Sequence, residues 1–360
     1  MAKIDALLDE LLRRRGSDLH LGVGYPPLLR ARGELVPLRE APIDDAEMEA
    51  LLFEIVSPAD REKITVELDL DFAYAYGDKA RFRANYFHKT TGLAAVFRTI
   101  PTKVLSLDDL GCPEVIRRMS ERRAGLVLVT GPTGSGKSTT LAAMIDRINR
   151  TRACHILTIE DPVEFVHPPI KAQVTHREVG PDASSFAAAI RSAGREDADV
   201  ILIGELRNNE TMKLALQLAS FGVLVFGTVH TNSAAATIDR ILNAFPADEQ
   251  PQVRGMLSES LVAIISQQLL KSVDGKGRVA AYEVLVSSSA LAAMIREGKT
   301  VQIPSLMQAG QSVGMQTMDM ALERLLQKGD VSFDDALEKA IDKETFTRAF
   351  DKRRAAVTGS

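Results

Sequence analysis

The sequence predicts an α/β protein in which a larger domain with a parallel sheet follows a smaller α+β domain. The first observation is a glycine-rich motif, G-x-x-x-x-G-K-S, between an apolar β-branched run and a helical pattern. The second is a series of near-continuous apolar runs that alternate with helical stretches, as in a parallel sheet covered on both faces. The third is the clean alternation of apolar and polar residues before residue 100. At 360 residues the chain is long enough for two such domains.

The smaller domain opens with an amphipathic helix that ends at Gly16. Its apolar positions recur at helical spacing, at Ile4, Leu7, Leu8, Leu11 and Leu12. Residues 68–76 then alternate as a strand, the chain turns at 77–78, and residues 80–86 return. The side chains expected on the inner face of this hairpin are Leu68, Leu70, Phe72, Tyr74, Tyr76, Ala80, Phe82, Ala84 and Tyr86.

A third apolar run, at residues 93–100, completes the smaller domain. The polar segment that follows, 101–106, begins with a proline and predicts a linker. We therefore expect domains at 1–100 and 107–360.

Three arginines, Arg81, Arg83 and Arg98, lie on the outer face of these strands. Taken alone, they are most simply explained as solvated charges on an open sheet face. Their clustering on strands that lead into the larger domain is the only feature of the residues themselves that indicates another role.

The glycine-rich motif has the chemistry of a phosphate-binding loop. Gly131, Gly134 and Gly136 allow backbone angles at which successive N–H groups point at phosphate oxygens. Lys137 supplies a positive charge, Ser138 offers a hydroxyl to Mg²⁺, and the following helix directs its positive end at the same oxygens. The motif predicts a nucleoside triphosphate site. The residues expected around the nucleotide are Gly131, Thr133, Gly134, Ser135, Gly136, Lys137, Ser138 and Thr139.

Three apolar runs downstream end in Glu160, Glu205 and His230. Ligands of open parallel sheets bind beyond the carboxyl ends of the strands, where all three residues fall. Glu205 is a candidate base that orients or deprotonates the attacking water, and its alternative role is an acid that favours a helix dipole. Because Gly204 stands where many phosphate-loop proteins have an aspartate, Mg²⁺ must rely on Ser138, the phosphates and water.

Three carboxylates lie within five residues at one of these strand ends, on Glu160, Asp161 and Glu164. Such density can hold Mg²⁺ through water or polarise the nucleophile, and a proline turn with solvated acids explains it equally well. His230 is a candidate sensor of the γ-phosphate, although a lone histidine at a strand end is as often structural.

Charge and cysteine content argue against other classes of protein. The net charge is −4, and no basic stripe with aromatic residues is present, which disfavours nucleic-acid translocation. No apolar segment approaches the roughly 20 residues of a membrane span, and the N-terminus lacks the apolar core of a signal peptide. Cys112 and Cys154 are isolated, so we expect neither disulfides nor structural zinc. A cytoplasmic protein without nucleic-acid partners or membrane insertion is therefore expected.

Together these motifs resemble the secretion-superfamily hexameric ATPases, most closely the type IV pilus retraction ATPases of the PilT type. The resemblance runs from about Ser17 to about Leu326. Its motifs are 81–85, 96–101, the phosphate loop, an aspartate box at 159–165, a Walker-B-like segment at 203–207, a histidine box at 227–231, and 293–298. Relatives that power pilus assembly or type II secretion commonly carry a tetracysteine zinc element, which two isolated cysteines cannot form.

The resemblance implies a PAS-like N-terminal domain joined flexibly to a RecA-like ATPase domain with C-terminal helices, and a ring of six subunits that bind ATP and Mg²⁺ between the domains. It also implies roles for individual residues. Glu205 would be the catalytic base, Glu160, Asp161, Glu164 and His230 would arrange metal, water and γ-phosphate, Ser138 would serve the metal, and Arg83 and Arg98 would be arginine fingers.

The implied function is an ATP-driven motor that retracts type IV pili and supports twitching motility. The implied location is the cytoplasmic face of the inner membrane. The implied partners are five further copies of the chain, an inner-membrane pilus platform protein and a paralogous retraction ATPase.

One departure from the family pattern concerns residues 220–223. The retraction family usually reads Glu-Thr-Gly-His there, whereas this chain has Ser220-Phe221-Gly222-Val223. We expect this change to remove hydrogen-bonding side chains beside the histidine box. It motivates an alternative function, an accessory paralogue that binds ATP but hydrolyses it weakly. The other interpretation is that the apolar pair is tolerated as core packing.

Overall fold

The computed structural model describes residues 2–31, 33–77, 79–100, 103–275 and 277–358. The chain packs into two compact units. The first is Met1–Lys103 with Asp161–Val166, and the second is Val104–Glu160 with His167–Ser360. Asp78 of the expected turn, and Pro101 and Thr102 of the expected linker, lie outside the described residues.

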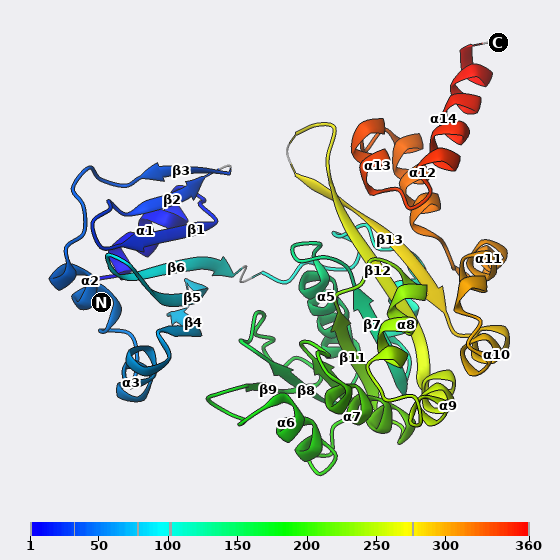
Figure 1. Ribbon diagram of the computed structural model, residues 1–360, viewed down its shortest axis with the longest axis horizontal. Helices are drawn as coiled ribbons and strands as arrows, with labels where there is room; N and C mark the ends of the chain where they lie inside the picture. The colour runs from blue at the N-terminus through cyan, green and yellow to red at the C-terminus, as the bar shows by residue number, and fades with distance from the viewer. Residues whose placement is uncertain (1, 32, 78, 101–102, 276, 359–360) are drawn as a thin grey trace. The chain divides into compact units, whose positions relative to one another are not determined.

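The first unit contains a six-stranded antiparallel sheet with the strand order β3-β2-β1-β6-β5-β4 (Figure 1). Its elements are α1 (Asp5–Arg13), β1 (Asp18–Gly22), β2 (Leu28–Ala31), β3 (Glu34–Pro37), α2 (Asp45–Leu52), α3 (Pro58–Glu67), β4 (Asp69–Tyr76), β5 (Ala80–Lys89) and β6 (Gly92–Ile100). The apolar stripe of α1 enters the core of this unit, as its helical spacing predicts.

The hairpin β4–β5 shows which predictions hold on this sheet. The four inner residues expected on β5, Ala80, Phe82, Ala84 and Tyr86, are all buried. The prediction for Leu68 was wrong, since this side chain is 55% exposed. Leu68 is the C-cap of α3 and has a left-handed conformation with φ of 63°. It therefore precedes the strand and does not take part in the alternation of inner and outer side chains.

The second unit contains a seven-stranded sheet with the order β13-β12-β7-β11-β10-β8-β9, parallel except for the pair β12–β13. The predicted parallel sheet is confirmed. Its elements up to the sheet's last strand are α4 (Glu114–Ser120), β7 (Gly125–Thr130), α5 (Lys137–Thr151), β8 (His155–Glu160), β9 (Gln173–Glu178), α6 (Phe186–Ala193), β10 (Val200–Ile203), α7 (Asn209–Ser220), β11 (Leu224–Val229), α8 (Ala234–Asn243), α9 (Gln250–Ser260), β12 (Leu261–Lys271) and β13 (Arg278–Val286).

Helices cover both faces of this sheet, which explains the continuous apolar runs. Leu126 and Leu128 of β7 pack in the core formed with α6 to α9. Val127 and Val129 of the same strand pack on the opposite side with α4 and α5. Because the strands β7, β8, β10 and β11 run parallel, their carboxyl ends lie at one edge of the sheet, where their loops meet.

The C-terminal part adds helices that Figure 1 shows beyond β13. They are α10 (Ser289–Glu297), α11 (Ile303–Ala309), α12 (Met318–Lys328), α13 (Phe333–Lys339) and α14 (Lys343–Thr358), with short 3₁₀ turns at Thr300–Gln302 and Gln311–Val313. Helices α12 to α14 share an apolar core with Leu270 of β12 and Ala281 of β13. The strands β9, β12 and β13 were not predicted from the sequence.

Candidate nucleotide-binding site

A phosphate-binding loop joins β7 to α5 in the second unit. Gly131 and Gly136 have positive φ angles of 144° and 89°. A Cβ on Gly131 would lie 2.4 Å from the carbonyl oxygen of Gln267, and one on Gly136 would lie 2.8 Å from Nε2 of Gln267. Both positions therefore require glycine, because β12 packs directly against the loop.

The loop offers several groups to an anion. Helix α5 begins without a side-chain cap, which leaves the N–H groups of its first turn without a capping acceptor. The Ser135 hydroxyl is buried and has no hydrogen-bond partner among the described residues. Nζ of Lys137 donates to the carbonyl oxygens of Gly131 at 2.9 Å and Pro132 at 3.0 Å. The arrangement fits the phosphates of a nucleotide.

The remaining residues predicted around the nucleotide lie on the same loop. Thr133 and Gly134 are exposed at its crest, while Ser138 and Thr139 are half-buried in the first turn of α5. The structure thus brings all eight predicted nucleotide-binding residues together on one loop and helix start.

Gln267 is a residue of this site that sequence reasoning missed. Its side chain is 3% exposed, and its Oε1 accepts a hydrogen bond from the Thr140 hydroxyl at 2.8 Å. Beside it, the hydroxyls of Ser266 and Thr130 lie 2.8 Å apart. Strand β12 therefore holds both ends of the loop through polar side chains. The available signal was the polar stretch 266–268 inside an apolar run.

Glu205 and His230 meet beyond the edge of the sheet. The two side chains follow β10 and β11, which are parallel neighbours. Oε1 of Glu205 lies 3.5 Å from Nε2 of His230, and its Oε2 accepts from Nε of Arg207 at 2.8 Å. The N–H of Gly204 donates to the carbonyl oxygen of Ile159 at 2.8 Å, which ties this segment to β8.

The three predicted carboxylates of the aspartate box separate between the units. Glu160 ends β8 in the second unit and is buried, with 9% exposed. Asp161 is exposed and Glu164 half-buried, and both pack with the first unit. Of the three carboxylates, Glu160 therefore lies in the second unit, at the carboxyl end of β8.

Arg83 and Arg98 are cross-strand partners on β5 and β6 of the first unit. Nη2 of Arg83 lies 2.5 Å from Oδ2 of Asp71, and this hydrogen bond raises the pKa of the Arg83 guanidinium. Nε of Arg98 donates to Oδ1 of Asp18 at 2.8 Å. Burial alone would raise the pKa of Asp18, but hydrogen bonds from Arg98 and Ser17 outweigh it and lower that pKa. Each predicted arginine finger is thus held by a carboxylate.

The expectation that residues 220–223 lie beside the histidine box was wrong. This segment joins α7 to the beginning of β11, whereas His230 follows the end of that strand. Six strand residues separate the two, a distance of roughly 20 Å. The N–H of Gly125 donates to the carbonyl oxygen of Val223 at 3.0 Å, and the Phe221 side chain is 84% exposed.

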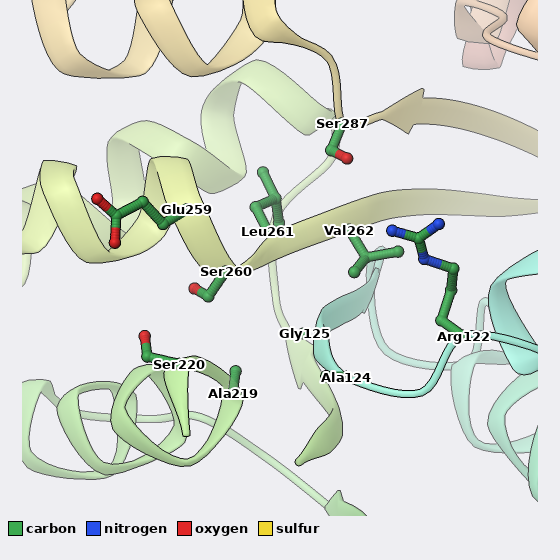
Figure 2. A pocket seen from close by; sticks show the side chains of 10 residues that line it. All are labelled: Arg122, Ala124, Gly125, Ala219, Ser220, Glu259, Ser260, Leu261, Val262 and Ser287. Carbon is green, nitrogen blue, oxygen red and sulfur yellow. The ribbon is translucent and has the colours of Figure 1, made fainter. Parts of the chain in front are cut away.

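A pocket of about 230 Å³ lies at this end of the sheet, where β7 begins at Gly125. Figure 2 shows the side chains that line it. Ser220 at the end of α7 and Ser260 at the end of α9 line it, together with Arg122 and Glu259. The hydroxyls of Ser220 and Ser260 donate to the carbonyl oxygens four residues earlier in their helices. Both serine hydroxyl protons are therefore used within their own helices.

Two features are absent from the described residues. No group of three or more His, Cys, Asp or Glu side chains is placed to hold a metal ion. No helix in the described part of the chain is long and apolar enough to cross a bilayer. Both cysteines are free, and burial raises the pKa of Cys112 to about 11.

Residues 67–276 match the family model described as Type II/IV secretion system protein. The chain is 50% identical over 343 residues to the type IV pilus retractation ATPase PilT of Pseudomonas aeruginosa, which covers 95% of this chain and 99% of that protein. It is 48% identical over 321 residues to a twitching motility protein of Neisseria gonorrhoeae, covering 89% and 86%. Identity to the type IV pilus ATPase PilU of Pseudomonas aeruginosa is 37% over 338 residues, covering 94% and 88%.

Solved structures show the same similarity. The crystal structure of the pilus retraction motor PilT with bound ADP superposes with a TM-score of 0.89 at 42% identity, covering 97% of this chain and 99% of that one. The ATPase DotB of Legionella pneumophila superposes with a TM-score of 0.81 at 28% identity, covering 92% and 93%.

Proposed function

The chain belongs to the family of type II/IV secretion system proteins, and from this membership we propose that it is an ATP-hydrolysing motor of type IV pilus retraction. The observation that carries the proposal is 50% sequence identity over nearly the full length of a retraction ATPase, combined with a complete phosphate loop. It is an ATPase that binds nucleotide on the 131–139 loop and works in twitching motility.

We assign the chemistry of hydrolysis to Glu205 and His230. Glu205 takes the proton of the attacking water through Oε1, which lies 3.5 Å from Nε2 of His230, while Oε2 stays hydrogen-bonded to Arg207. His230 senses the γ-phosphate from the same edge. Lys137 leaves the loop carbonyls of Gly131 and Pro132 to neutralise the transferring phosphate.

Mg²⁺ would be held by the hydroxyl of Ser138, half-buried in the first turn of α5, together with the phosphates of the nucleotide. Glu160, Asp161 and Glu164 would help to arrange the metal or its waters. When bound, the ion would neutralise negative charge on the phosphate oxygens. Gly204 cannot provide a side-chain ligand.

Arg83 and Arg98 act as arginine fingers on the transition state. They point from neighbouring strands and form a cross-strand pair, so one domain movement can deliver both. To do so they must leave Asp71 and Asp18, and these carboxylates hold them in place until then.

We propose further that six copies form a ring, because fingers on one domain and a phosphate loop on another require coordinated closure. The ring works at the cytoplasmic face of the inner membrane against a pilus platform protein, and a paralogous retraction ATPase is a further partner. Light scattering with ATP present tests the ring, and a monomer alone would contradict it.

The test of the function is hydrolysis and motility with Glu205→Gln. The near-isosteric amide cannot accept the proton, so turnover should fall by about 10²-fold or more while ATP still binds. The matched control is Glu210→Gln, an exposed acid on α7 that pairs with Arg191 and should leave turnover unchanged. Hydrolysis by Glu205→Gln at the parental rate would remove Glu205 as the base. Normal twitching after gene deletion would remove the retraction role.

The alternative is a weakly hydrolysing accessory paralogue. It was motivated by the expected position of residues 220–223 beside the histidine box. Residues 220–223 lie at the opposite end of β11 from His230. Identity to PilU is also lower than identity to PilT, at 37% against 50%. We therefore favour the motor.

A further inference from the structure

Glu283 on β13 is a buried carboxylate for which the hydrolytic mechanism has no role. Its side chain is only 3% exposed. Oε1 accepts a hydrogen bond from the N–H of Ala234 at 2.6 Å, and Oε2 accepts one from the N–H of Met318 at 3.1 Å. Among the described residues, no lysine, arginine or histidine acts on this carboxylate. Its two oxygens therefore serve two separate backbone donors.

These donors are the first N–H groups of two helices, α8 and α12. Each helix already has its own N-cap, because Ser233 accepts from Ala236 and Thr317 accepts from Met320. A buried carboxylate is costly unless it is well paired. Burial raises the pKa of Glu283 above its usual value, and the backbone hydrogen bonds from Ala234 and Met318 offset this only in part. Helix capping alone does not explain a buried charge shared between two helices.

The two helices have different neighbours. Helix α8 begins four residues after His230, so Ala234 closes the short loop that carries the proposed γ-phosphate sensor. Helix α12 opens the C-terminal group α12 to α14, which has a core of its own with the ends of β12 and β13. Glu283 thus contacts the nucleotide-side loop through one oxygen and the C-terminal helices through the other.

The connection to α12 is reinforced by the backbone. Val284, next to Glu283, exchanges two hydrogen bonds with Gln316, at 2.8 Å and 3.0 Å. The side-chain Nε2 of Gln316 also donates to the carbonyl oxygen of Tyr282 at 2.6 Å. The segment that leads into α12 is therefore hydrogen-bonded to β13 at the residues on both sides of Glu283. A rotation of the Glu283 carboxylate would act on the N-terminus of α12 while this segment stays in place.

We propose that Glu283 is a positioning residue that couples the loop 230–233 to helices α12 to α14. When nucleotide binding or hydrolysis moves His230, the N–H of Ala234 moves with it, and the shared carboxylate passes the displacement to Met318. The proposal rests on the proposed nucleotide function. If the coupling operates, the C-terminal helices α12 to α14 change when nucleotide binds or is hydrolysed.

The experiment is hydrogen exchange on the full-length protein, with and without a non-hydrolysable ATP analogue and Mg²⁺. In the parent, nucleotide should slow exchange at three places: the phosphate loop, residues 230–238 and residues 316–324. In Glu283→Gln, one oxygen becomes an N–H₂ donor that cannot accept from a backbone N–H. The response at 316–324 should then fall at least about threefold, while the responses at the other two places remain.

The matched control is the double variant Ser233→Ala/Thr317→Ala, which removes both N-caps and keeps Glu283. Exchange near both helix N-termini should become faster in this variant because the caps are lost, with all three nucleotide responses retained. Glu283→Asp is the second variant, since a side chain shorter by one methylene cannot reach both donors. If α12 keeps its full response in Glu283→Gln or Glu283→Asp, or never responds in the parent, the coupling is disproved. If the phosphate loop itself does not respond, the proposed nucleotide function fails instead.

A second readout separates coupling from a general loss of stability. The hydrogen bonds of Glu283 go to Ala234 and Met318, and not to the phosphate loop or Glu205. Glu283→Gln should therefore lower kcat by several-fold, with KM for ATP changed less than about twofold. Equal changes in kcat and KM for the double cap variant and for Glu283→Gln would indicate a purely structural role.

Discussion

At the scale of single residues, the ammonium group of Lys137 rests on carbonyl oxygens that a phosphate would replace. Its hydrogen bonds to Gly131 and Pro132 keep the charge at the loop. We predict that Lys137→Ala weakens ATP binding by about tenfold to a hundredfold, the range expected for a charge-assisted hydrogen bond. Calorimetric titration with ATP measures it. Lys213→Ala, which removes a half-buried lysine paired with Glu249, is the control. Equal affinities of the two variants would contradict the assignment.

The two arginines of the first unit lead to a different prediction. Arg83→Ala and Arg98→Ala should each lower kcat more than they weaken ATP binding, because arginine fingers act on charge that develops in the transition state. The expected loss in kcat is about 10³-fold for a finger of ordinary strength. Steady-state kinetics together with nucleotide affinity test it. Equal losses in the two quantities would indicate ground-state binding.

Sequence identified those residues of the site whose chemistry is encoded by spacing. The phosphate loop could be predicted because its glycines, lysine and serine have fixed offsets. The contact of Glu205 with His230 was partly foreseeable, since both follow strands of one parallel sheet. Gln267 and the carboxylates that hold the arginines could not be found, because cross-strand register, which sets these contacts, is invisible in one sequence.

At the scale of elements, the loop between β8 and β9 and strand β9 itself place two histidines together. The rings of His167 and His176 are stacked with centroids 6.0 Å apart, and the N–H of His167 donates to Nε2 of His176 at 3.1 Å. Burial, aided by the charge of His176 and opposed by that of Asp146, lowers the pKa of His167 to about 4. This pair therefore favours a neutral His167 in the folded chain.

The lowered pKa predicts acid sensitivity. Above pH 6.5 neither the folded nor the unfolded chain binds a proton at His167. As the pH falls from 6.5 towards 4, only the unfolded chain takes one up, so the free energy of unfolding decreases, by about 2 kcal/mol between pH 7.5 and pH 5. Urea unfolding at both pH values, in the parent and in His167→Gln, isolates this contribution. The same pH dependence in both proteins would show that His167 is not responsible.

Elements were predicted where one periodicity dominated. The strands β7, β8, β10 and β11 and the helices α6 to α8 follow from apolar runs and helical stripes. The strands β12 and β13 did not, because polar residues at 266, 267 and 283 interrupt their apolar runs. Those interruptions are the residues that support the phosphate loop and join two helices. The apolar pattern thus failed to predict strands in which buried polar side chains make specific hydrogen bonds.

At the scale of the whole molecule, sequence patterns describe each domain as one continuous stretch. The packing instead places Asp161–Val166, from the middle of the larger stretch, with residues 1–103. A linear pattern cannot show which core a proline-containing loop joins, because Val163 and Phe165 look like core residues in either unit. The aspartate box is therefore divided between Glu160 in one unit and Asp161 with Glu164 in the other.

The last prediction concerns residues 220–223 and decides between motor and accessory subunit. The segment lies where β11 begins, and the backbone of Val223 pairs with Gly125 rather than with the histidine box. The side chain of Phe221 projects into solvent, so neither hydrogen bonds nor packing near the phosphate loop depend on it. We therefore expect Ser220→Glu/Phe221→Thr/Val223→His to leave intrinsic ATP turnover within about twofold of the parent, less than 0.5 kcal/mol of barrier.

Steady-state hydrolysis by the purified parent and the triple variant measures this difference, and light scattering on both confirms that assembly is equal. Since β11 separates the segment from His230, a rise in turnover of about tenfold, or 1.4 kcal/mol, could not come from the site in the same chain. Such a rise would mean that the segment acts across a contact between copies, and it would restore the weakly hydrolysing subunit as the better description of the parent. An unchanged rate leaves the exposed Phe221 ring without influence on hydrolysis, as its place at the start of β11 requires.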